Sequence, residues 1–290
     1  MQCPVDPMHG RWYQNGKILA TAAAMLFLTG VHSKPRVAVE QLPPQKPLMI
    51  IDPGHGGVDE GTPVAGITED EITYDVSVRV QELLQQRGYR TYRTVHDAET
   101  GAVPQENLQN GTREYLVAPE GNIPLTAKLL TKRCEIINAA TRGKKTILVS
   151  IHADSTFPFR AGVRTFYPSE AQYGSKDSEA QSYMLANAID AAMVQANIPT
   201  AQINYGGIPL FPIESVDATL LRDGELYRLA IFGETALERK VLVELANLQN
   251  PSDRESMLSA NGRQSAAVAI AAGIEQYCRS TSSSNSGTLP

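Results

Sequence analysis

Short apolar runs that stop at polar or glycine-rich segments alternate with amphipathic stretches along this 290-residue chain, and this alternation is the strongest constraint on its fold. A nearly continuous apolar run such as 146–151 is typical of a strand buried on both faces of a sheet. Strands that alternate with helices predict an α/β architecture. We therefore expect a single layered domain with a central, mostly parallel twisted sheet flanked by helices. The strand-like runs are 48–51, 89–95, 146–151, 162–167 and 241–243, and the helix-like stretches are 69–87, 125–141, 178–196 and 260–278.

The first 34 residues are expected to lie outside this domain. Arg11 and Lys17 precede an apolar run at 18–31, which is shorter than the roughly 20 residues of a membrane span. A basic segment followed by a short apolar run is typical of a secretory signal peptide. An uncleaved N-terminal anchor stays open, because no clean A-x-A cleavage motif follows. Either reading predicts an exported protein, periplasmic or extracellular.

The remaining boundaries follow from composition. Residues 35–47 contain four prolines and are expected to form a linker, and the domain should span 48–279. The Ser-rich segment 280–290 should be a disordered tail. Residues 96–124 are long, polar and weakly patterned, and they are expected to form an inserted loop. Cys134 and Cys278 are either two separate buried thiols or, in an oxidising compartment, a disulfide.

Polar side chains stand at the ends of three predicted strands. His55 follows the first strand in Asp-Pro-Gly-His-Gly-Gly (52–57), His152 ends the run 150–152, and Glu244 follows Val243. Ligands of open α/β sheets bind at the carboxyl ends of the strands. We therefore expect His55, His152 and Glu244 to converge on one crevice.

A fourth candidate lies where the first helix begins. Glu69 could return to the same crevice, although its neighbours Asp70 and Glu71 are acids too and spacing alone does not choose among the three. Two imidazoles and one carboxylate with an open position form the ligand set of a catalytic zinc ion. Glu244 would then act as general base and acid.

Each residue also has a plain structural reading. A loop histidine can simply be hydrogen-bonded, a rim glutamate can be solvated, and an acid in a first helical turn is stabilised by the helix dipole. On the functional reading, Asp52 or Asp154 would orient an imidazole from the second layer of contacts.

The motifs resemble those of the zinc-dependent N-acetylmuramoyl-L-alanine amidases of bacterial cell-wall turnover. The resemblance rests on four segments in the family's order, over roughly residues 48–278: DPGHGG (52–57), GITEDEI (66–72), SIHAD (150–154) and VLVEL (241–245) with NPSD (250–253). It implies Zn²⁺ held by His55, Glu69 and His152, with Glu244 as the catalytic residue. Glu69 is selected because the family's ligand glutamate stands three residues before the first apolar residue of its helix, here Ile72. The implied reaction is hydrolysis of the amide bond between N-acetylmuramic acid and L-alanine in peptidoglycan, which releases stem peptides.

The sequence departs from the family's pattern at two places, and two other functions stay open. The segment after Glu244 lacks the glycine and phenylalanine common in the family, and the 96–124 loop is longer than the family's connection. A zinc carboxypeptidase-like peptidase uses the same ligand set, with Arg164 or Arg222 as candidates to hold a terminal carboxylate. A catalytically silent wall-binding protein on the same fold is the other alternative.

The 96–124 loop either covers or shapes the cleft, or offers a carboxylate from Glu106, Glu114 or Glu120, or is a solvated surface loop. The net charge of −5, from 26 basic and 31 acidic residues, argues against a sequence-blind nucleic-acid binder, so no nucleic-acid partner is expected. A monomer is expected, and no feature of the sequence identifies a protein activator.

Overall fold

The computed structural model describes residues 45–284 except 64–65, 67, 110, 112, 156 and 171–174, and between 201 and 228 it describes only the backbone of five short strands. The described residues belong to one compact unit, Gln45–Pro290. The predicted signal peptide or anchor (1–34), most of the predicted linker (35–47) and residues 285–290 lie outside the described residues. Within the described ranges, no helix is both long and apolar enough to cross a membrane.

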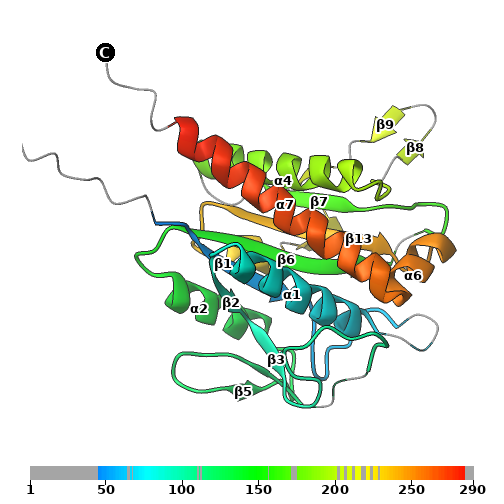
Figure 1. Cartoon of the computed structure of the whole chain (residues 1–290), viewed down its shortest axis with the longest axis horizontal. Coiled ribbons are helices and arrows are strands. Elements are labelled where there is room, and N and C mark those ends of the chain that lie inside the picture. The colour runs from blue at the N-terminus through cyan, green and yellow to red at the C-terminus, as the bar shows by residue number, and fades with distance from the viewer. Residues whose placement is uncertain are drawn as a thin grey trace, which may run out of the picture. The chain divides into compact units, whose positions relative to one another are not determined.

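The core of the domain is a six-stranded sheet in the order β10-β7-β13-β6-β1-β2 (Figure 1). Every neighbouring pair is parallel except β7 and β13, which are antiparallel. The predicted layered α/β domain with a mostly parallel sheet is therefore confirmed. The strands are β1 (Leu48–Pro53), β2 (Arg90–Arg93), β6 (Thr146–Asp154), β7 (Arg164–Pro168), β10 (Ile213–Val216) and β13 (Lys240–Asn247).

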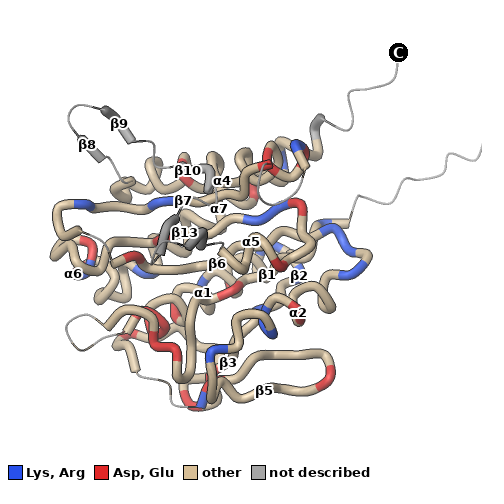
Figure 2. The backbone as a smooth tube through the Cα atoms, turned by 180° about the vertical axis from the view of Figure 1, so that it is seen from behind, with Lys and Arg blue, Asp and Glu red and all other residues tan. Residues whose placement is uncertain are grey.

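Helices cover both faces of the sheet. Three of them, α1 (Glu69–Gln86), α4 (Lys176–Gln195) and α7 (Ala260–Ser284), lie over the face seen in Figure 1. Two shorter ones, α2 (Leu130–Thr141) and α5 (Ala230–Gly233), pack on the opposite face, which Figure 2 shows. Finally, α6 (Pro251–Leu258) follows β13.

Alternation along each strand explains this layering, because successive side chains point to opposite faces. Met49 and Ile51 of β1 pack into the cluster that contains α1, α4 and α7, whereas Leu48 and Ile50 pack with the residues of α2 and α5. Cys134 belongs to the second cluster and Cys278 packs against the first, and both are free thiols. The disulfide alternative is therefore not the arrangement found.

The segment 96–124 is more ordered than the predicted loop. It contributes to a three-stranded antiparallel sheet formed by β3 (Val95–Asp97), β4 (Glu114–Leu116) and β5 (Ile123–Pro124). Val95 and Leu116 are buried with Tyr74 and Val78 of α1. These strands of two or three residues are too short to show a period of two in the sequence, which is why the prediction missed them.

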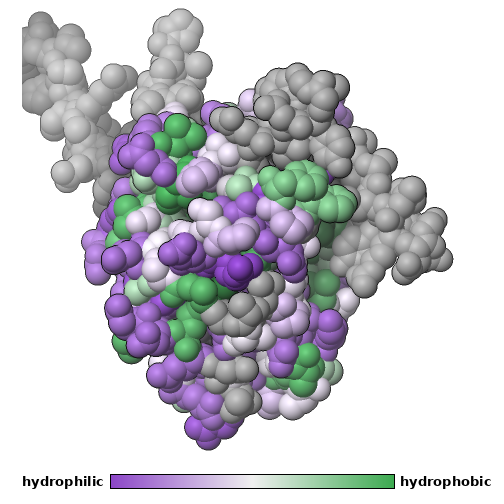
Figure 3. All heavy atoms as spheres, turned by 90° about the vertical axis from the view of Figure 1, so that its right-hand side faces the viewer, coloured by the Kyte–Doolittle hydropathy of each residue, from purple (hydrophilic) through white to green (hydrophobic). Residues whose placement is uncertain are grey.

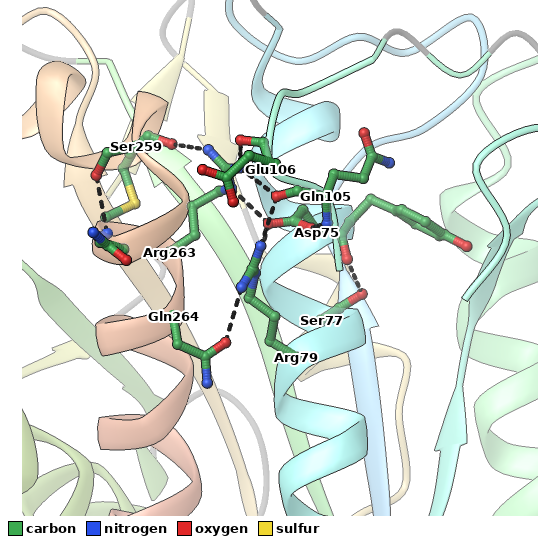
Figure 4. Close-up of polar contacts among 12 residues, drawn as sticks. Asp75, Ser77, Arg79, Gln105, Glu106, Ser259, Arg263 and Gln264 are labelled. Carbon is green, nitrogen blue, oxygen red and sulfur yellow. Dashed lines mark hydrogen bonds and ion pairs between the residues drawn. The ribbon is translucent and has the colours of Figure 1, made fainter. Parts of the chain in front are cut away.

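A buried charged cluster fixes this segment to two of the helices (Figure 4). The Asp75 carboxylate accepts hydrogen bonds from Arg79 Nε (2.8 Å), Arg263 Nε (2.5 Å) and the backbone N–H of Gln105 (2.7 Å). Both guanidinium groups also donate to the carbonyl oxygen of Gln105. Since Asp75 and Arg79 lie in α1 and Arg263 in α7, one buried cluster joins both helices to the inserted segment.

The last helix is longer than expected. It continues to Ser284, whereas the tail was predicted to begin at 280. The hydroxyl groups of Ser280, Thr281 and Ser282 donate to the carbonyl oxygens of Tyr277 and Cys278, which gives these polar residues hydrogen bonds inside the helix. Two shorter hairpins, β8 (Ile203–Tyr205) with β9 (Ile208–Leu210) and β11 (Leu220–Arg222) with β12 (Glu225–Tyr227), complete the described elements.

Candidate metal centre

The predicted site residues meet where β1, β6 and β13 end. His152 lies in β6 opposite Glu244 of β13 in the parallel register, and His55 follows β1 after Pro53 and Gly54. Glu69 is the first residue of α1 and reaches both histidines. The convergence expected from strand ends is therefore what the structure shows.

The loop that carries His55 has an unusual backbone. His55 has a φ of 64°, in the left-handed region that residues other than glycine rarely adopt, and Gly56 and Gly57 also have positive φ. Arg133 of α2 holds this loop, because its guanidinium donates to the carbonyl oxygens of Pro53 (2.6 Å) and His55. Gly54 is needed for a different reason, since a Cβ there would lie only 2.4 Å from Cε1 of His152.

Glu69 lies between the two imidazoles. Its Oε1 is 3.2 Å from Nε2 of His55 and 3.1 Å from Nδ1 of His152, and one donor atom from each residue lies within 4.8 Å of the others. The two rings meet nearly edge to face, with centroids 5.1 Å apart. Two nitrogens and one carboxylate oxygen this close together could hold a metal ion, and this donor set suits zinc.

Electrostatics keep the central carboxylate charged. Burial alone would raise the pKa of Glu69, but hydrogen bonds and positive charge from His152 and His55 outweigh it and lower that pKa far below its ordinary value. The backbone N–H of Ala153 also donates to Glu69 Oε1 at 3.0 Å. An ionised carboxylate is the form that binds a cation.

The neighbouring acids, Asp70 and Glu71, lie outside this group. Asp70 accepts from the backbone N–H of Glu71, and Glu71 accepts from the backbone N–H of Thr68, where it completes a capping box at the start of α1. Of the three acids that spacing left open, Glu69 is the one in contact with both histidines.

Glu244 presents a half-buried side chain with one carboxylate oxygen shielded from water. Its Oε2 is buried and has no hydrogen-bond partner among the described residues. Burial, together with the negative charge of Glu69, raises the pKa of Glu244 to about 8, and the nearby Arg164 opposes this change. A carboxyl group beside the candidate metal ligands, with one oxygen that has no hydrogen-bond partner among the described residues, is well suited to accept and return a proton.

The carboxylate that contacts an imidazole of the candidate metal group belongs to neither of the two residues predicted for this role. Asp52 accepts from Thr94 and Ser150, and Asp154 is paired with Arg164, so neither contacts a histidine. Instead, Asp59 Oδ2 lies 3.3 Å from Nδ1 of His55. The sequence prediction missed Asp59 because the approach of its carboxylate to His55 depends on the turn of the glycine-rich loop. The position of Asp59 four residues after His55 is the only sequence signal for this contact.

The inserted segment contributes to the site through Glu114 of β4. The backbone N–H of Gly57, two residues after His55, donates to the Glu114 carboxylate. Glu106 and Glu120, the other carboxylates considered, are exposed. Of the three uses proposed for this segment, the structure therefore supports shaping the site.

A cavity of about 350 Å³ adjoins the histidines on the face covered by α2 and α5. Its wall is polar near His55 and His152 and apolar at Leu129, Ile231 and Leu242. Arg164, a candidate to bind a terminal carboxylate, is paired with Asp154 and does not line this cavity, and the side chain of Arg222 lies outside what the structure describes.

Comparisons with known proteins identify the family to which the chain is similar. Residues 49–276 match the N-acetylmuramoyl-L-alanine amidase family. An uncharacterized cell wall amidase of Bacillus anthracis is 30% identical over 230 residues, which cover 79% of this chain and 35% of that protein. A germination-specific N-acetylmuramoyl-L-alanine amidase of Bacillus subtilis (strain 168) is 28% identical over 127 residues, which cover 43% of this chain and 47% of that protein.

Solved structures show the same fold. The crystal structure of an N-acetylmuramyl-L-alanine amidase from Mycobacterium smegmatis superposes with a TM-score of 0.58 at 22% identity, and the match covers 81% of this chain and 98% of that one. The chain thus spans roughly a third to a half of the length of the two curated relatives, but nearly all of this solved structure.

Proposed function

Because the chain belongs to the N-acetylmuramoyl-L-alanine amidase family, we propose that it is a zinc-dependent hydrolase of peptidoglycan. It would cleave the amide bond between the lactyl group of N-acetylmuramic acid and L-alanine, and so release stem peptides from glycan strands. The observation that carries the proposal is the contact of Glu69 with both His55 and His152, beside the half-buried carboxylate of Glu244, whose Oε2 is shielded from water.

The donor atoms fit the expected cofactor. His55 Nε2, His152 Nδ1 and Glu69 Oε1 would hold a zinc ion, since three protein ligands and an open position define a catalytic zinc site. When bound, zinc supplies a Lewis acid that polarises the scissile carbonyl and makes water more acidic.

The chain's own residues perform the proton transfers. Glu244 would remove a proton from the attacking water and then deliver that proton to the nitrogen of L-alanine as the amide bond breaks. Asp59, through its contact with His55 Nδ1, would fix the ring so that Nε2 faces Glu69. The apolar part of the adjoining cavity would exclude water from one side of the reacting group.

The carboxypeptidase-like alternative has less support. Such an enzyme needs a cation free to bind the terminal carboxylate of a peptide; of the two candidates, Arg164 is paired with Asp154, and the side chain of Arg222 lies outside the described residues. The silent wall-binding alternative would be favoured by a missing site residue, whereas the contacts of Glu69 with both histidines and the position of Glu244 opposite His152 support a complete set. Export, the signal peptide, a monomeric state and the catalytic range 48–279 remain part of this proposal.

The test is digestion of purified cell-wall sacculi by the full chain, with and without a chelator. We expect intact stem peptides with a free L-alanine amino group, and no release after chelation. Release of single amino acids would support the peptidase reading instead, and release that ignores the chelator would contradict the role of the metal.

A further inference from the structure

The loop between β6 and β7 exposes two phenylalanine side chains. Phe157 is 56% exposed and Phe159 is 68% exposed. Their rings are stacked, with centroids 5.4 Å apart and planes 11° from parallel. Two large apolar rings held together in solvent form a surface patch of the type that marks recognition sites.

Side chains of the next elements hold this loop in place. Asn247, the last residue of β13, donates through Nδ2 to the carbonyl oxygens of Phe157 (2.8 Å) and Arg160 (2.9 Å). Asn250 Nδ2 donates to the carbonyl oxygen of Pro158 at 2.9 Å. The rings are therefore exposed on a preorganised loop, which loses little freedom when a ligand binds.

One further anchor ties the loop to α6. The carboxylate of Asp253 accepts from the backbone N–H groups of Gly162 (2.7 Å) and Asn247 (2.9 Å). Asn250 and Asp253 belong to the Asn-Pro-Ser-Asp segment singled out in the sequence. That segment thus supports the aromatic loop rather than the metal group.

The loop lies on the side of the molecule where the candidate metal ligands gather. Phe157 is only five residues after His152, so their Cα atoms are at most about 18 Å apart. Phe157 and Phe159 do not line the cavity beside the histidines. In Figure 1, α6 follows β13 on this side of the molecule. Figure 3 shows the molecule from the same side, with hydrophobic patches among hydrophilic residues.

We propose that Phe157 and Phe159 form a stacking platform for sugar rings of the glycan strand whose stem peptide is cleaved at the metal group. The inference rests on the proposed amidase function. Its substrate is a polymer, so sugars on either side of the cleaved muramic acid extend beyond the cavity. A platform a short distance from the ligand His152 would contact these neighbouring sugars.

The chemistry of the patch matches a sugar better than a peptide stem. A pyranose ring has an apolar C–H face that packs on the flat face of an aromatic ring, and hydroxyl groups at its edge that need polar partners. Beside the platform, Gln249 is exposed and donates to the Ser155 hydroxyl at 3.1 Å, and the Arg160 guanidinium lies 5.5 Å from the centre of the Phe157 ring. The exposed Gln249 amide and the Arg160 guanidinium, which lies over the Phe157 ring, are the polar groups beside the rings that an N-acetylated sugar requires.

The test measures glycan binding without catalysis. The full chain, with its metal, is titrated with a soluble tetrasaccharide of alternating N-acetylglucosamine and N-acetylmuramic acid, which carries no stem peptide to cleave. The double variant Phe157→Ala/Phe159→Ala should bind at least tenfold more weakly than the wild type. Val194→Ala, which truncates a 56% exposed side chain on α4, should bind like the wild type. Both variants should unfold at the wild-type temperature, because the truncated side chains are exposed.

A second measurement separates the platform from the metal group. Hydrolysis of a single N-acetylmuramoyl peptide should keep its wild-type kcat and KM in the double variant, whereas KM for polymeric glycan should rise. If the double variant bound the tetrasaccharide as tightly as the wild type, the proposed platform would be overturned. The same holds if the double variant lost affinity for a protein partner while its affinity for the sugar was unchanged. Because the titration needs no turnover, tight tetrasaccharide binding by a chain that releases no stem peptide would refute the amidase and keep the platform.

Discussion

Replacing Glu114 with glutamine should change how the stability of the metal-free protein depends on pH. The Glu114 side chain is 7% exposed, and its carboxylate accepts the backbone N–H of Gly57. Burial, with the negative charges of Asp70 and Asp97, raises the pKa of Glu114 from 4.5 to about 7, against the opposing effects of the Gly57 hydrogen bond and Arg133. Glutamine has nearly the same shape, stays neutral and can still accept that hydrogen bond.

The sign follows from the direction of this change. An acid whose pKa is higher in the folded protein than in the unfolded chain binds more protons when folded. Its contribution to stability is therefore complete below pH 4.5 and is lost as the pH rises through about 7. Since one pKa unit corresponds to about 1.36 kcal/mol, the loss is on the order of 3 kcal/mol. Glu114→Gln should thus gain up to about 3 kcal/mol of unfolding free energy over the wild type between pH 4.5 and pH 8.

Urea unfolding with a chelator present, at intervals from pH 4.5 to pH 8, measures this gain. Glu120→Gln is the matched control, because Glu120 is exposed on the same inserted segment and should show no such trend. If the difference in unfolding free energy between Glu114→Gln and the wild type stayed constant or became smaller as the pH rises, the reasoning would be refuted. It would mean that Glu114 is ionised at neutral pH in the folded, metal-free protein.

Three further substitutions test other parts of the account. Glu244→Gln should lower kcat at least about 100-fold while zinc content, measured by atomic absorption, stays at the wild-type value, and wild-type turnover would remove Glu244 from the reaction. Asp75→Ala leaves the two guanidinium groups of Figure 4 without their carboxylate, so urea unfolding should show a loss of about 3–5 kcal/mol. The exposed acid Glu135 is paired with the exposed Lys132, so its alanine variant should lose less than about 1 kcal/mol of unfolding free energy, and equal losses for the two variants would contradict the buried cluster's role. Gly273→Ala would bring a Cβ within 2.5 Å of the Ile189 Cα where α7 meets α4, and the resulting overpacking, about 1–3 kcal/mol, should exceed the gain of about 1 kcal/mol in helix propensity. A variant with higher thermal stability than the wild type would contradict that close contact.

Much of the fold could be predicted because short, nearly continuous apolar runs are typical of strands buried on both faces of a layered sheet. The runs at 48–51, 146–151 and 241–243 became β1, β6 and β13, and the polar residues that follow them gathered at one edge. His55, Glu69, His152 and Glu244 could be found this way because each stands at the end of a strand or the start of a helix.

Other features could not be predicted, because they depend on tertiary contacts. Asp75 and Arg79 stand four residues apart, a spacing that is common for ion pairs on an exposed helix surface, and their burial becomes evident only in the structure, where Arg263 of α7 packs against them. Glu114 was one of three acids in a polar segment, and nothing local showed that it faces Gly57. The exposure of Phe157 and Phe159 contradicts the ordinary expectation for aromatic residues, so only the structure reveals it.

The most direct test of the central claim joins metal content to product identity in one preparation. Full-length protein purified without chelators should contain one zinc ion per chain, and His152→Ala should contain far less. Mass spectrometry of wall fragments digested by the same wild-type sample should show intact stem peptides beginning with L-alanine and glycan strands with free lactyl carboxylates. A zinc-free protein that still releases these peptides, or a zinc-bound one that leaves the amide bond uncut, would contradict the account.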